Sequence, residues 1–321
     1  MPILVTGASG FVGSMLLPRL LLDGHQVRAL GRDRERTLQA LELLDAEEVD
    51  VVRGDALLGD GLDAALDGVD VAYYLIHSME SSPALNATFA DRERIAAENF
   101  AAAAARAGVR RIVYLGGLLP AWDERPLGVD APPVSRHLAS RARVERILLD
   151  AVPDSIALRA SIVVGARSRS FRLLVRLVER MPVLTLPAWR RFRTQPIDER
   201  DVIEMLARCI NAPMPGRSLD VGGRDILTYG DMLTRIADLM LLRRPAVGLR
   251  INLTPVAARV AAAIVGEDPA LVLPLMEGLQ GDLLPADDHA AELLGVRVHS
   301  FDSAVEHALT EWEDLEPLAA R

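Results

Sequence analysis

The chain contains no lysine, and all 36 of its basic residues are arginine. This absence excludes a Schiff-base lysine, the phosphate-binding lysine of a P-loop and a Tyr-x-x-x-Lys catalytic pair. A single cysteine, Cys209, excludes an intrachain disulfide framework and a metal site built from several thiolates. It falls on the apolar side of a predicted helix, which is typical of a packing residue.

Two kinds of targeting segment are also missing. No run of about 18 uncharged apolar residues occurs, so we expect no transmembrane helix. Residues 1–10 lack the basic start and apolar stretch of a signal peptide, and we therefore expect a cytoplasmic protein. The net charge of −9 argues against general nucleic-acid binding, because phosphates require a basic surface.

Short apolar runs alternate with segments of helical period through the first two thirds of the chain. The runs predict strands at 3–6, 26–30, 49–52, 69–76, 111–115, 155–164 and 218–221. Helical periodicity follows a glycine turn after the first strand and recurs at 34–44, 62–66, 91–107, 144–149, 171–180 and 201–210. Strands that are apolar on both faces and separated by helices indicate a doubly wound parallel sheet.

The length of 321 residues suggests about two domains, or one large α/β domain with an appendage. We predict an α/β protein with a Rossmann-type doubly wound parallel sheet over residues 1–225. From Tyr229 onwards the pattern is mainly helical and interrupted by prolines, so residues 226–321 are predicted to form a small, mostly helical C-terminal cap. The segment at about 166–195 is expected to contribute to that cap.

A glycine-rich turn joins the first strand to the first helix. Without Cβ atoms, Gly7, Gly10 and Gly13 would let a dinucleotide pyrophosphate approach the backbone at the positive end of the helix dipole. A tight turn with no ligand is the alternative, but the position between strand and helix favours a cofactor site. The residues assigned to the cofactor here are Thr6, Gly7, Ser9, Gly10, Phe11, Val12 and Gly13.

The tip of the second strand carries an arginine. An acidic residue there would hold a ribose hydroxyl of NAD, whereas Arg32 can hold the 2′-phosphate of NADP bidentately. Three further arginines lie close by, at Arg28, Arg34 and Arg36, while Asp33 is evidence against this interpretation. The alternative is a solvated arginine face. We predict that NADP(H) is preferred over NAD(H).

The carboxyl ends of the next strands complete the predicted site, because ligands collect at that edge of a parallel sheet. Asp55 is placed to meet the adenine side or is only a turn residue. Ser78 and Met79 are assigned to the substrate, with a capped turn and an ordinary loop methionine as the alternatives. The other residues assigned to the cofactor are Ala56, Leu75, Ile76, His77, Gly116 and Gly117.

Several motifs in order resemble the extended and atypical short-chain dehydrogenases, in particular the NmrA-like NAD(P)H-binding branch. They are 5–13 (VTGASGFVG), 27–33 (VRALGRD), 54–55 (GD), 107–115 (AGVRRIVYL), 158–165 (LRASIVVG), 195–197 (QPI), 201–202 (DV) and 219–223 (LDVGG). Residues 73–79 (YYLIHSM) are similar to one subgroup of bacterial NAD(P)H-binding proteins. The resemblance covers residues 1–225 and implies the fold and the cofactor.

The same resemblance implies a departure in the catalytic residues. In the catalytic branch a tyrosine and a lysine four residues later act with a serine after the fifth strand. Here His137 falls in place of the tyrosine, Arg141 in place of the lysine, and glycines in place of the serines. His137 could donate or accept a proton, with its pKa lowered by the arginine on the same helix face. The alternative is an amphipathic helix with two polar residues facing water or cofactor.

Two arginine clusters follow the sixth strand and precede Pro196. They favour an anionic ligand if they border the cleft, and a solvated face otherwise; from them Arg167 and Arg193 are assigned to the substrate. Asp198 and Asp201 are predicted to cap the helix that follows them, and no spacing resembles a metal site. The clusters consist of Arg167, Arg169, Arg172, Arg176, Arg190, Arg191 and Arg193.

Together these features predict an NADPH-dependent oxidoreductase that acts on an unknown small molecule. The alternatives are a non-catalytic NADP(H)-sensing regulator and a structural subunit that retains the cofactor. The predicted partner is a small-molecule substrate or a protein that binds according to cofactor state. We expect a monomer or homodimer with no integral membrane segment.

Overall fold

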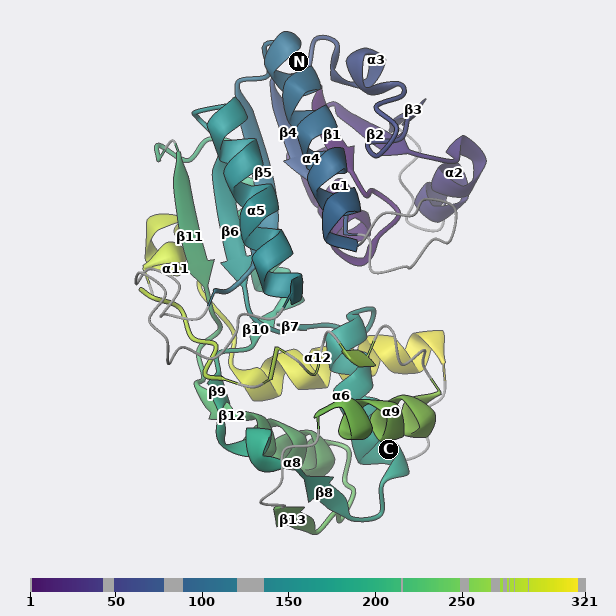
Figure 1. Cartoon of the computed structure of the whole chain (residues 1–321), viewed down its shortest axis with the longest axis vertical. Coiled ribbons are helices and arrows are strands. Elements are labelled where there is room, and N and C mark those ends of the chain that lie inside the picture. The colour runs from purple at the N-terminus through teal and green to yellow at the C-terminus, as the bar shows by residue number, and fades with distance from the viewer. Residues whose placement is uncertain are drawn as a thin grey trace.

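The computed structural model has two layers, a parallel sheet with its helices above and a mainly helical layer below (Figure 1). It describes residues 2–42, 49–77, 89–119, 136–214, 216–248, 254–266, 272–273, 276, 278–279, 281–287 and 289–316. None of the helices in these ranges combines the length and the apolarity that crossing a membrane requires.

Seven parallel strands form the main sheet, in the order β11-β6-β5-β4-β1-β2-β3. They are β1 (Ile3–Thr6), β2 (Val27–Gly31), β3 (Asp50–Arg53), β4 (Val71–Tyr74), β5 (Arg111–Gly117), β6 (Ile156–Ala160) and β11 (Arg217–Val221). The order reverses beside β1, which is the topology of a doubly wound Rossmann sheet. The fold class predicted from the sequence is confirmed.

Helices cover both faces of the sheet, because successive strand side chains point to opposite sides. Val5 and Val27 pack with α1 (Phe11–Leu22) and α7 (Glu199–Arg208) on one face. Leu4 and Ile112 pack with α3 (Leu62–Leu66), α4 (Phe89–Arg106) and α5 (Arg136–Ala151) on the other. Helix α2 (Arg34–Glu42) also belongs to this layer. Burial on both faces explains why the strands read as continuous apolar runs.

The lower layer has its own apolar cluster, which contains Phe171, Trp189, Tyr229, Phe301 and Trp312. Its helices are α6 (Arg169–Arg180), η1 (Ala188–Arg191), α8 (Tyr229–Leu239), α9 (Thr254–Val265) and α12 (Phe301–Leu315). The short α11 (Ala290–Leu293) packs instead with the upper layer. The domain boundary near residue 225 stays a prediction.

Three two-stranded ladders lie below the main sheet (Figure 1). They pair β10 (Ile197–Asp198) with β7 (Val163–Val164), β12 (Leu227–Thr228) with β9 (Arg193–Thr194), and β13 (Ala246–Gly248) with β8 (Leu184–Leu186). The single strand expected at 155–164 is therefore two strands. Ser161 separates them, because its hydroxyl donates to the Gln195 carbonyl at 2.6 Å and the chain turns towards β10 there.

Helices α5 and α1 can be compared with the sequence expectation. The apolar period predicts α5 only from residue 144, whereas the helix begins at Arg136 and includes His137 and Arg141, which the sequence analysis placed on one helix face. Helix α1 runs through Pro18, which the sequence placed inside a helix. The proline lacks an N–H donor and removes one ladder bond without ending the helix.

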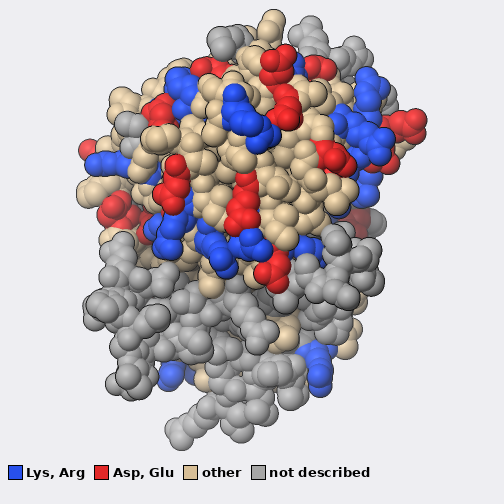
Figure 2. Space-filling model, turned by 45° about the horizontal axis from the view of Figure 1, so that its top comes forward, with Lys and Arg blue, Asp and Glu red and all other residues tan. Residues whose placement is uncertain are grey.

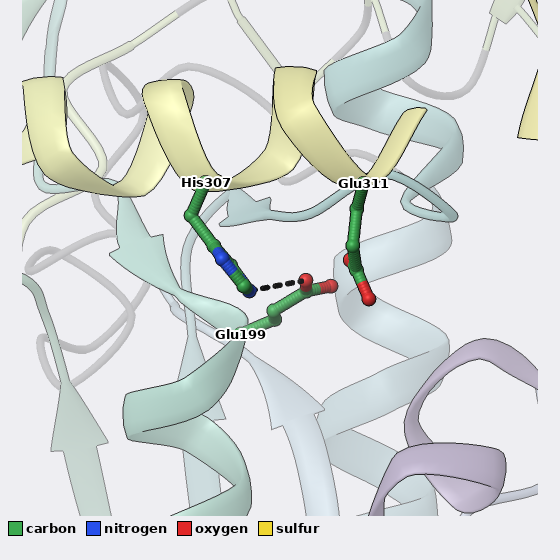
Figure 3. Close-up of side chains that lie close together, drawn as sticks. All are labelled: Glu199, His307 and Glu311. Atoms are coloured by element: carbon green, nitrogen blue, oxygen red, sulfur yellow. Dashed lines mark ion pairs between the residues drawn. The ribbon is translucent and has the colours of Figure 1, made fainter. Parts of the chain in front are cut away.

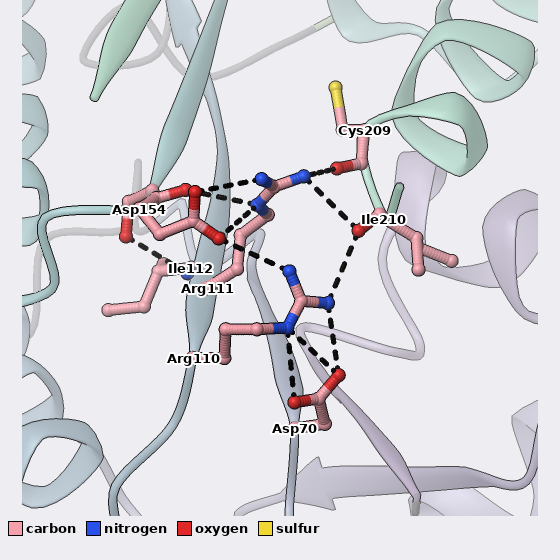
Figure 4. Close-up of polar contacts among 8 residues, drawn as sticks. Asp70, Arg110, Arg111, Ile112, Asp154, Cys209 and Ile210 are labelled. Atoms are coloured by element: carbon pink, nitrogen blue, oxygen red, sulfur yellow. Dashed lines mark hydrogen bonds and ion pairs between the residues drawn. The ribbon is translucent and has the colours of Figure 1, made fainter. Parts of the chain in front are cut away.

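Where the strands begin, an arginine network closes the sheet (Figure 4). Arg111 is 3% exposed and donates to the carbonyls of Cys209 at 2.6 Å and Ile210 at 3.1 Å. It also pairs with Asp154 at 2.9 Å, which lowers the pKa of that carboxyl. Cys209 itself is fully buried, and burial raises the pKa of its thiol to about 12. The cysteine is thus a packing residue at the end of α7.

The outer surface mixes both signs of charge, as Figure 2 shows for one face. Arginines on the upper helices pair with nearby acids; for example, Arg106 lies 2.7 Å from Asp63 and Arg94 lies 2.6 Å from Glu98. Such exposed pairs contribute little stability each. They account for part of the arginine content without any binding role.

Candidate functional site

A pocket of about 880 Å³ opens at the carboxyl ends of the sheet strands. Its upper wall comes from the turn after β1 and from the ends of β2, β4 and β5. Its lower wall includes Leu173 and Leu174 of α6, Tyr229 of α8, and Leu283. The pocket therefore lies between the two layers, at the edge where parallel sheets bind ligands.

The glycine turn forms one wall of this pocket and leaves no room for side chains. Gly7 has a φ of 66°, and a Cβ there would lie 2.9 Å from the Leu75 carbonyl oxygen. A Cβ on Gly13 would lie 2.3 Å from the Gly7 oxygen. Glycine is required at both positions because the contacting atoms belong to the backbone.

The first turn of α1 faces the pocket with free backbone donors. Gly10 is the N-cap residue and provides no side-chain cap. The pocket is lined by Ser9, Gly10, Phe11, Val12 and Gly13, and the first N–H groups of a helix have no acceptor within it. This arrangement fits the pyrophosphate of a dinucleotide for two reasons. The glycine backbone can be approached closely because it has no Cβ atoms, and the positive end of the helix dipole faces the same place.

Thr6 lies behind the turn and does not line the pocket. Its hydroxyl donates to the Tyr73 carbonyl at 3.0 Å and accepts from the Leu75 N–H at 3.0 Å, with the residue fully buried. It thereby fixes the end of β1 to the end of β4. The structure places Thr6 as a support of the turn, whereas the sequence analysis assigned it to the cofactor.

The four arginines near the tip of β2 point in two directions. Arg32 and Arg36 line the pocket. Arg28 instead pairs with Asp50 at 2.8 Å, and Arg34 donates to the Val51 carbonyl at 3.4 Å. Asp33 lines the pocket as well, but its carboxylate accepts the Arg36 N–H at 3.1 Å.

Asp55 and Ala56 follow β3 and line the same side of the pocket. The Asp55 carboxylate accepts the Leu57 N–H at 2.8 Å, and its backbone bridges to Asp60. Asp55 is therefore a turn residue whose position also meets the pocket. Both interpretations drawn from the sequence fit this placement.

The ends of β4 and β5 bring the remaining assigned residues to the pocket. Leu75, Ile76 and His77 line it after β4, and Gly116 and Gly117 line it at the end of β5. A Cβ on Gly117 would lie 3.1 Å from the Leu138 side chain. Gly117 therefore lets α5 approach the strand closely, whereas a Cβ on Gly116 would lie 2.8 Å from the Tyr114 ring.

A histidine pair lies at the centre of the pocket wall. The ring centroids of His77 and His137 are 4.9 Å apart. Nδ1 of His77 lies 3.2 Å from one oxygen of Glu93, and the Ser140 hydroxyl donates to the other at 2.5 Å. Glu93, on α4, is buried, so this carboxylate holds both α5 and the histidine in place.

Burial and positive charge keep both imidazoles neutral. Burial, helped by Arg141 and His77, lowers the pKa of His137 to about 3. The pKa of His77 is also well below its usual value, again chiefly because of burial. A neutral imidazole offers one N–H donor and one acceptor nitrogen at physiological pH. His137 is therefore suited to donate a hydrogen bond and unsuited to act as an imidazolium acid.

Arg141 lies one helical turn beyond His137 and lines the same pocket. Its Nη1 donates to the Tyr114 hydroxyl at 3.3 Å and to the Leu115 carbonyl at 3.4 Å. The guanidinium is thus anchored at the end of β5, next to the expected place of the substrate. It supplies a fixed positive charge that cannot be lost by deprotonation.

The substrate assignments divide into three groups. Arg167 lines the pocket and is exposed. Arg193 does not line it, because its guanidinium pairs with Asp282 at 2.7 Å. Ser78 and Met79 lie outside the described residues.

Most of the remaining cluster arginines are held elsewhere. Arg172 and Arg176 pair with Glu316 and stack on the Trp312 ring at 4.4 and 4.9 Å. Arg169 is the exception, because it lines the pocket beside Arg167. Only the first cluster therefore contributes to the site among the residues that the structure describes.

Several pocket residues escaped the sequence analysis. Glu93 and Arg92 are buried charged residues within the alanine-rich α4, and Arg92 lines the pocket. A pair of charges on the apolar side of such a helix was a detectable signal. Tyr229 reaches the pocket from α8, and no local pattern links that helix to a sheet so far away in the sequence.

Comparison with known proteins supports the cofactor assignment. A family model described as NAD(P)H-binding matches residues 7–154. The 3 beta-hydroxysteroid dehydrogenase/Delta 5-->4-isomerase of Mycobacterium tuberculosis is 37% identical over 119 residues, covering 35% of this chain and 30% of that enzyme. The mitochondrial NADH dehydrogenase (ubiquinone) 1 alpha subcomplex subunit 9 of Arabidopsis thaliana is 24% identical over 239 residues, covering 74% of this chain and 57% of the subunit. Both matches span less than two thirds of the relative.

Solved structures share the fold over the whole chain. The UDP-glucuronic acid 4-epimerase of Bacillus cereus, in complex with UDP-glucuronic acid and NAD, has a TM-score of 0.71 at 17% identity. The superposition covers 98% of this chain and 100% of the epimerase. At this identity the likeness concerns the architecture, including the helical layer beneath the sheet.

Proposed function

We propose that this chain, whose residues 7–154 match an NAD(P)H-binding family model, is an NADPH-dependent oxidoreductase of the short-chain dehydrogenase/reductase family. Its substrate is a small carbonyl compound or an activated alkene. One observation carries this proposal. His77, His137 and Arg141 line the pocket that the glycine turn opens.

The role of each residue follows from its charge state. The bound cofactor supplies the hydride. His137, kept neutral by burial, donates an N–H hydrogen bond to the substrate oxygen, as a neutral imidazole can do in a dry site. Arg141 stabilises the negative charge that develops on that oxygen. Because neutral imidazole releases its N–H proton poorly, the final proton comes from water.

The proposed cofactor preference rests on the tip of β2. Arg32 and Arg36 line the pocket. The carboxylate of Asp33 accepts a hydrogen bond from the backbone N–H of Arg36. Two guanidinium groups beside one carboxylate, one oxygen of which accepts the backbone N–H of Arg36, favour the 2′-phosphate of NADP(H) over the bare ribose of NAD(H). Titration of the purified protein with NADPH and with NADH, by calorimetry or nicotinamide fluorescence, tests this directly. Equal affinities would contradict it.

Turnover is tested by substrate-dependent NADPH oxidation across a panel of ketones, aldehydes and enones. With a substrate found, His137→Ala is expected to lower kcat by roughly 100-fold to 1,000-fold, the usual effect of losing one oxyanion donor. NADPH affinity should stay unchanged, which a parallel titration checks. Normal turnover of the variant would show that His137 does not donate a hydrogen bond that turnover needs.

A second candidate function is a non-catalytic subunit or sensor that retains the cofactor. Two observations favour it. The pKa of His137, about 3, leaves no acid in the place of the usual tyrosine, and the mitochondrial complex subunit matches 74% of the chain. This candidate predicts NADPH binding without oxidation of any panel substrate, together with capture of a protein partner that depends on the cofactor.

A further inference from the structure

Behind the glycine turn, three potential metal ligands meet from two helices (Figure 3). Glu199 is the first residue of α7, and its side chain is 2% exposed. His307 and Glu311 lie four residues apart on one face of α12. Figure 3 shows the side chains of Glu199 and Glu311 pointing towards each other, with the His307 ring beside them.

Within the described part of the chain, no hydrogen-bond donor balances the burial of the Glu199 carboxylate. Neither of its oxygens has a hydrogen-bond partner among the residues that the structure describes. The nearest positive candidate is Nε2 of His307, 3.8 Å away, and the side chain of His307 is one-third exposed. Burial of a charged carboxylate without partners is strongly unfavourable, so such a group normally binds a donor or a cation.

The geometry of the three side chains fits one ion. One ligand atom from each residue lies within 4.8 Å of the others. A tetrahedral zinc site has metal–ligand distances near 2.1 Å and therefore ligand–ligand distances of about 3.4 Å. Small side-chain rotations would bring the three atoms to that spacing. The exposed Glu311 leaves an open side where ions can enter and where a water can complete the shell.

We propose that Glu199, His307 and Glu311 form a binding site for a divalent transition-metal ion, with Zn²⁺ as the preferred occupant. One imidazole and two carboxylates are a ligand set that zinc accepts. Magnesium and calcium are disfavoured, because both prefer sites composed only of oxygen ligands.

The site would join α12 to the base of the cofactor turn. A Cβ added to Gly165, just after β7, would lie 1.7 Å from a Glu199 oxygen and 2.9 Å from the Phe11 ring. Glu199 and Phe11 therefore both lie against the backbone of Gly165. Phe11 begins α1 and lines the pocket, so an ion at Glu199 would stiffen the wall that holds the cofactor without touching it.

The competing explanation is a proton shared by the two carboxyl groups. Burial and the neighbouring Glu311 raise the pKa of Glu199 to about 9. A protonated Glu199 could donate to Glu311 and satisfy the pair without any metal. The two explanations differ in one measurable respect: only the first requires a stoichiometric ion.

The test uses the full chain without a histidine tag, stripped with EDTA and dialysed. Calorimetric titration with ZnCl₂ should show one equivalent bound, and thermal unfolding should shift upwards with zinc. Glu199→Gln and His307→Gln should each weaken zinc binding by on the order of 100-fold, since loss of even an outer-shell partner costs 10-fold to 100-fold. Glu306→Gln and His289→Gln are matched controls, because both residues are exposed and lie outside the cluster; they should bind zinc like the wild type.

Two results would overturn the proposal. One is no saturable zinc binding by the stripped wild type, with Glu199→Gln at least as heat-stable as the wild type, which is the shared-proton result. The other is equal zinc binding by the wild type and the cluster variants. If Glu199→Gln fails to fold, Glu311→Gln replaces it, since Glu311 is exposed. None of these readouts involves NADPH or turnover, so the outcome is independent of the proposed function.

Discussion

At the scale of single residues, the charged residues that follow β2 are adjacent in sequence but make different contacts. Arg32 lines the pocket, whereas Arg34 donates to a backbone carbonyl of β3. Asp33 receives the Arg36 N–H, which holds the start of α2 in place. The carboxylate that argued against NADP in the sequence thus has a local structural partner.

The first prediction concerns Arg32. Arg32→Ala should weaken NADPH binding by about 1–3 kcal/mol, the value of one charge-assisted hydrogen-bonding partner, and leave NADH binding almost unchanged. Arg34→Ala is the matched control and should change neither affinity. Titration of the three proteins with both cofactors provides the comparison. Equal losses for NADPH and NADH in Arg32→Ala would show that Arg32 does not contact the 2′-phosphate.

At the scale of elements, the turn between β1 and α1 cannot accept side chains at Gly7 and Gly13 without moving its backbone. Its geometry depends on backbone atoms that are already in contact, such as the Gly7 oxygen beside Gly13. Thr6 adds a second constraint by fixing β1 to the end of β4. The shape of the pocket wall is therefore a property of the turn and its supports together.

Gly13→Ala tests this dependence. The new methyl group would lie 2.3 Å from a backbone oxygen, so the turn must shift. We expect both NADPH and NADH to bind at least about tenfold more weakly, with a stability loss of about 1–3 kcal/mol from overpacking. Gly281→Ala is the control, because no atom lies within 4 Å of its added Cβ. Unchanged affinity in Gly13→Ala would mean that the ligand does not use this turn.

Most elements could be predicted from the sequence, since the strands are buried on both faces and therefore read as apolar runs. The first strand was predicted as 3–6 and the short third helix as 62–66, and the structure has the same bounds. The apolar period did not show the start of α5, because Leu138, Ala139 and Ala142 are the only apolar residues in 136–143. The break at Ser161 depends on a bond to Gln195 and has no local signal.

At the scale of the whole molecule, long-range pairs decided which candidate residues reach the site. The sequence assigned Arg193 to the substrate. In the structure its guanidinium pairs with Asp282, which lies 89 positions further along the chain. Glu199 likewise meets His307 only because α12 returns under the sheet. Residue type and spacing cannot reveal such pairs, whereas the glycine turn, whose parts are adjacent in sequence, was readable.

Acid stability provides a prediction at this scale. The pKa of His137 is about 3 in the folded protein, against 6.5 when unperturbed. Between these values the unfolded chain binds a proton that the folded chain does not, so folding stability falls as pH drops below about 6.5. One such group contributes a slope of up to about 1.4 kcal/mol per pH unit.

The measurement is the free energy of unfolding in urea at several pH values from 7 to 4. The wild type should lose more stability on acidification than His137→Gln, whose side chain does not titrate. His289→Gln should follow the wild type, because the side chain of His289 is 70% exposed. Parallel curves for the wild type and His137→Gln would show that His137 is not held neutral by the fold.

The position of α12 sets an order of events during synthesis. Every strand of the main sheet precedes residue 222, so the upper layer can assemble while the chain is still growing. The cluster around Phe171, Trp189 and Tyr229 also needs Phe301 and Trp312, which are synthesised later. Until then its aromatic surface is open to chaperones and to other nascent chains. Helix α12 thus completes the lower core late, and we expect this cluster to be most prone to aggregation immediately before α12 is synthesised.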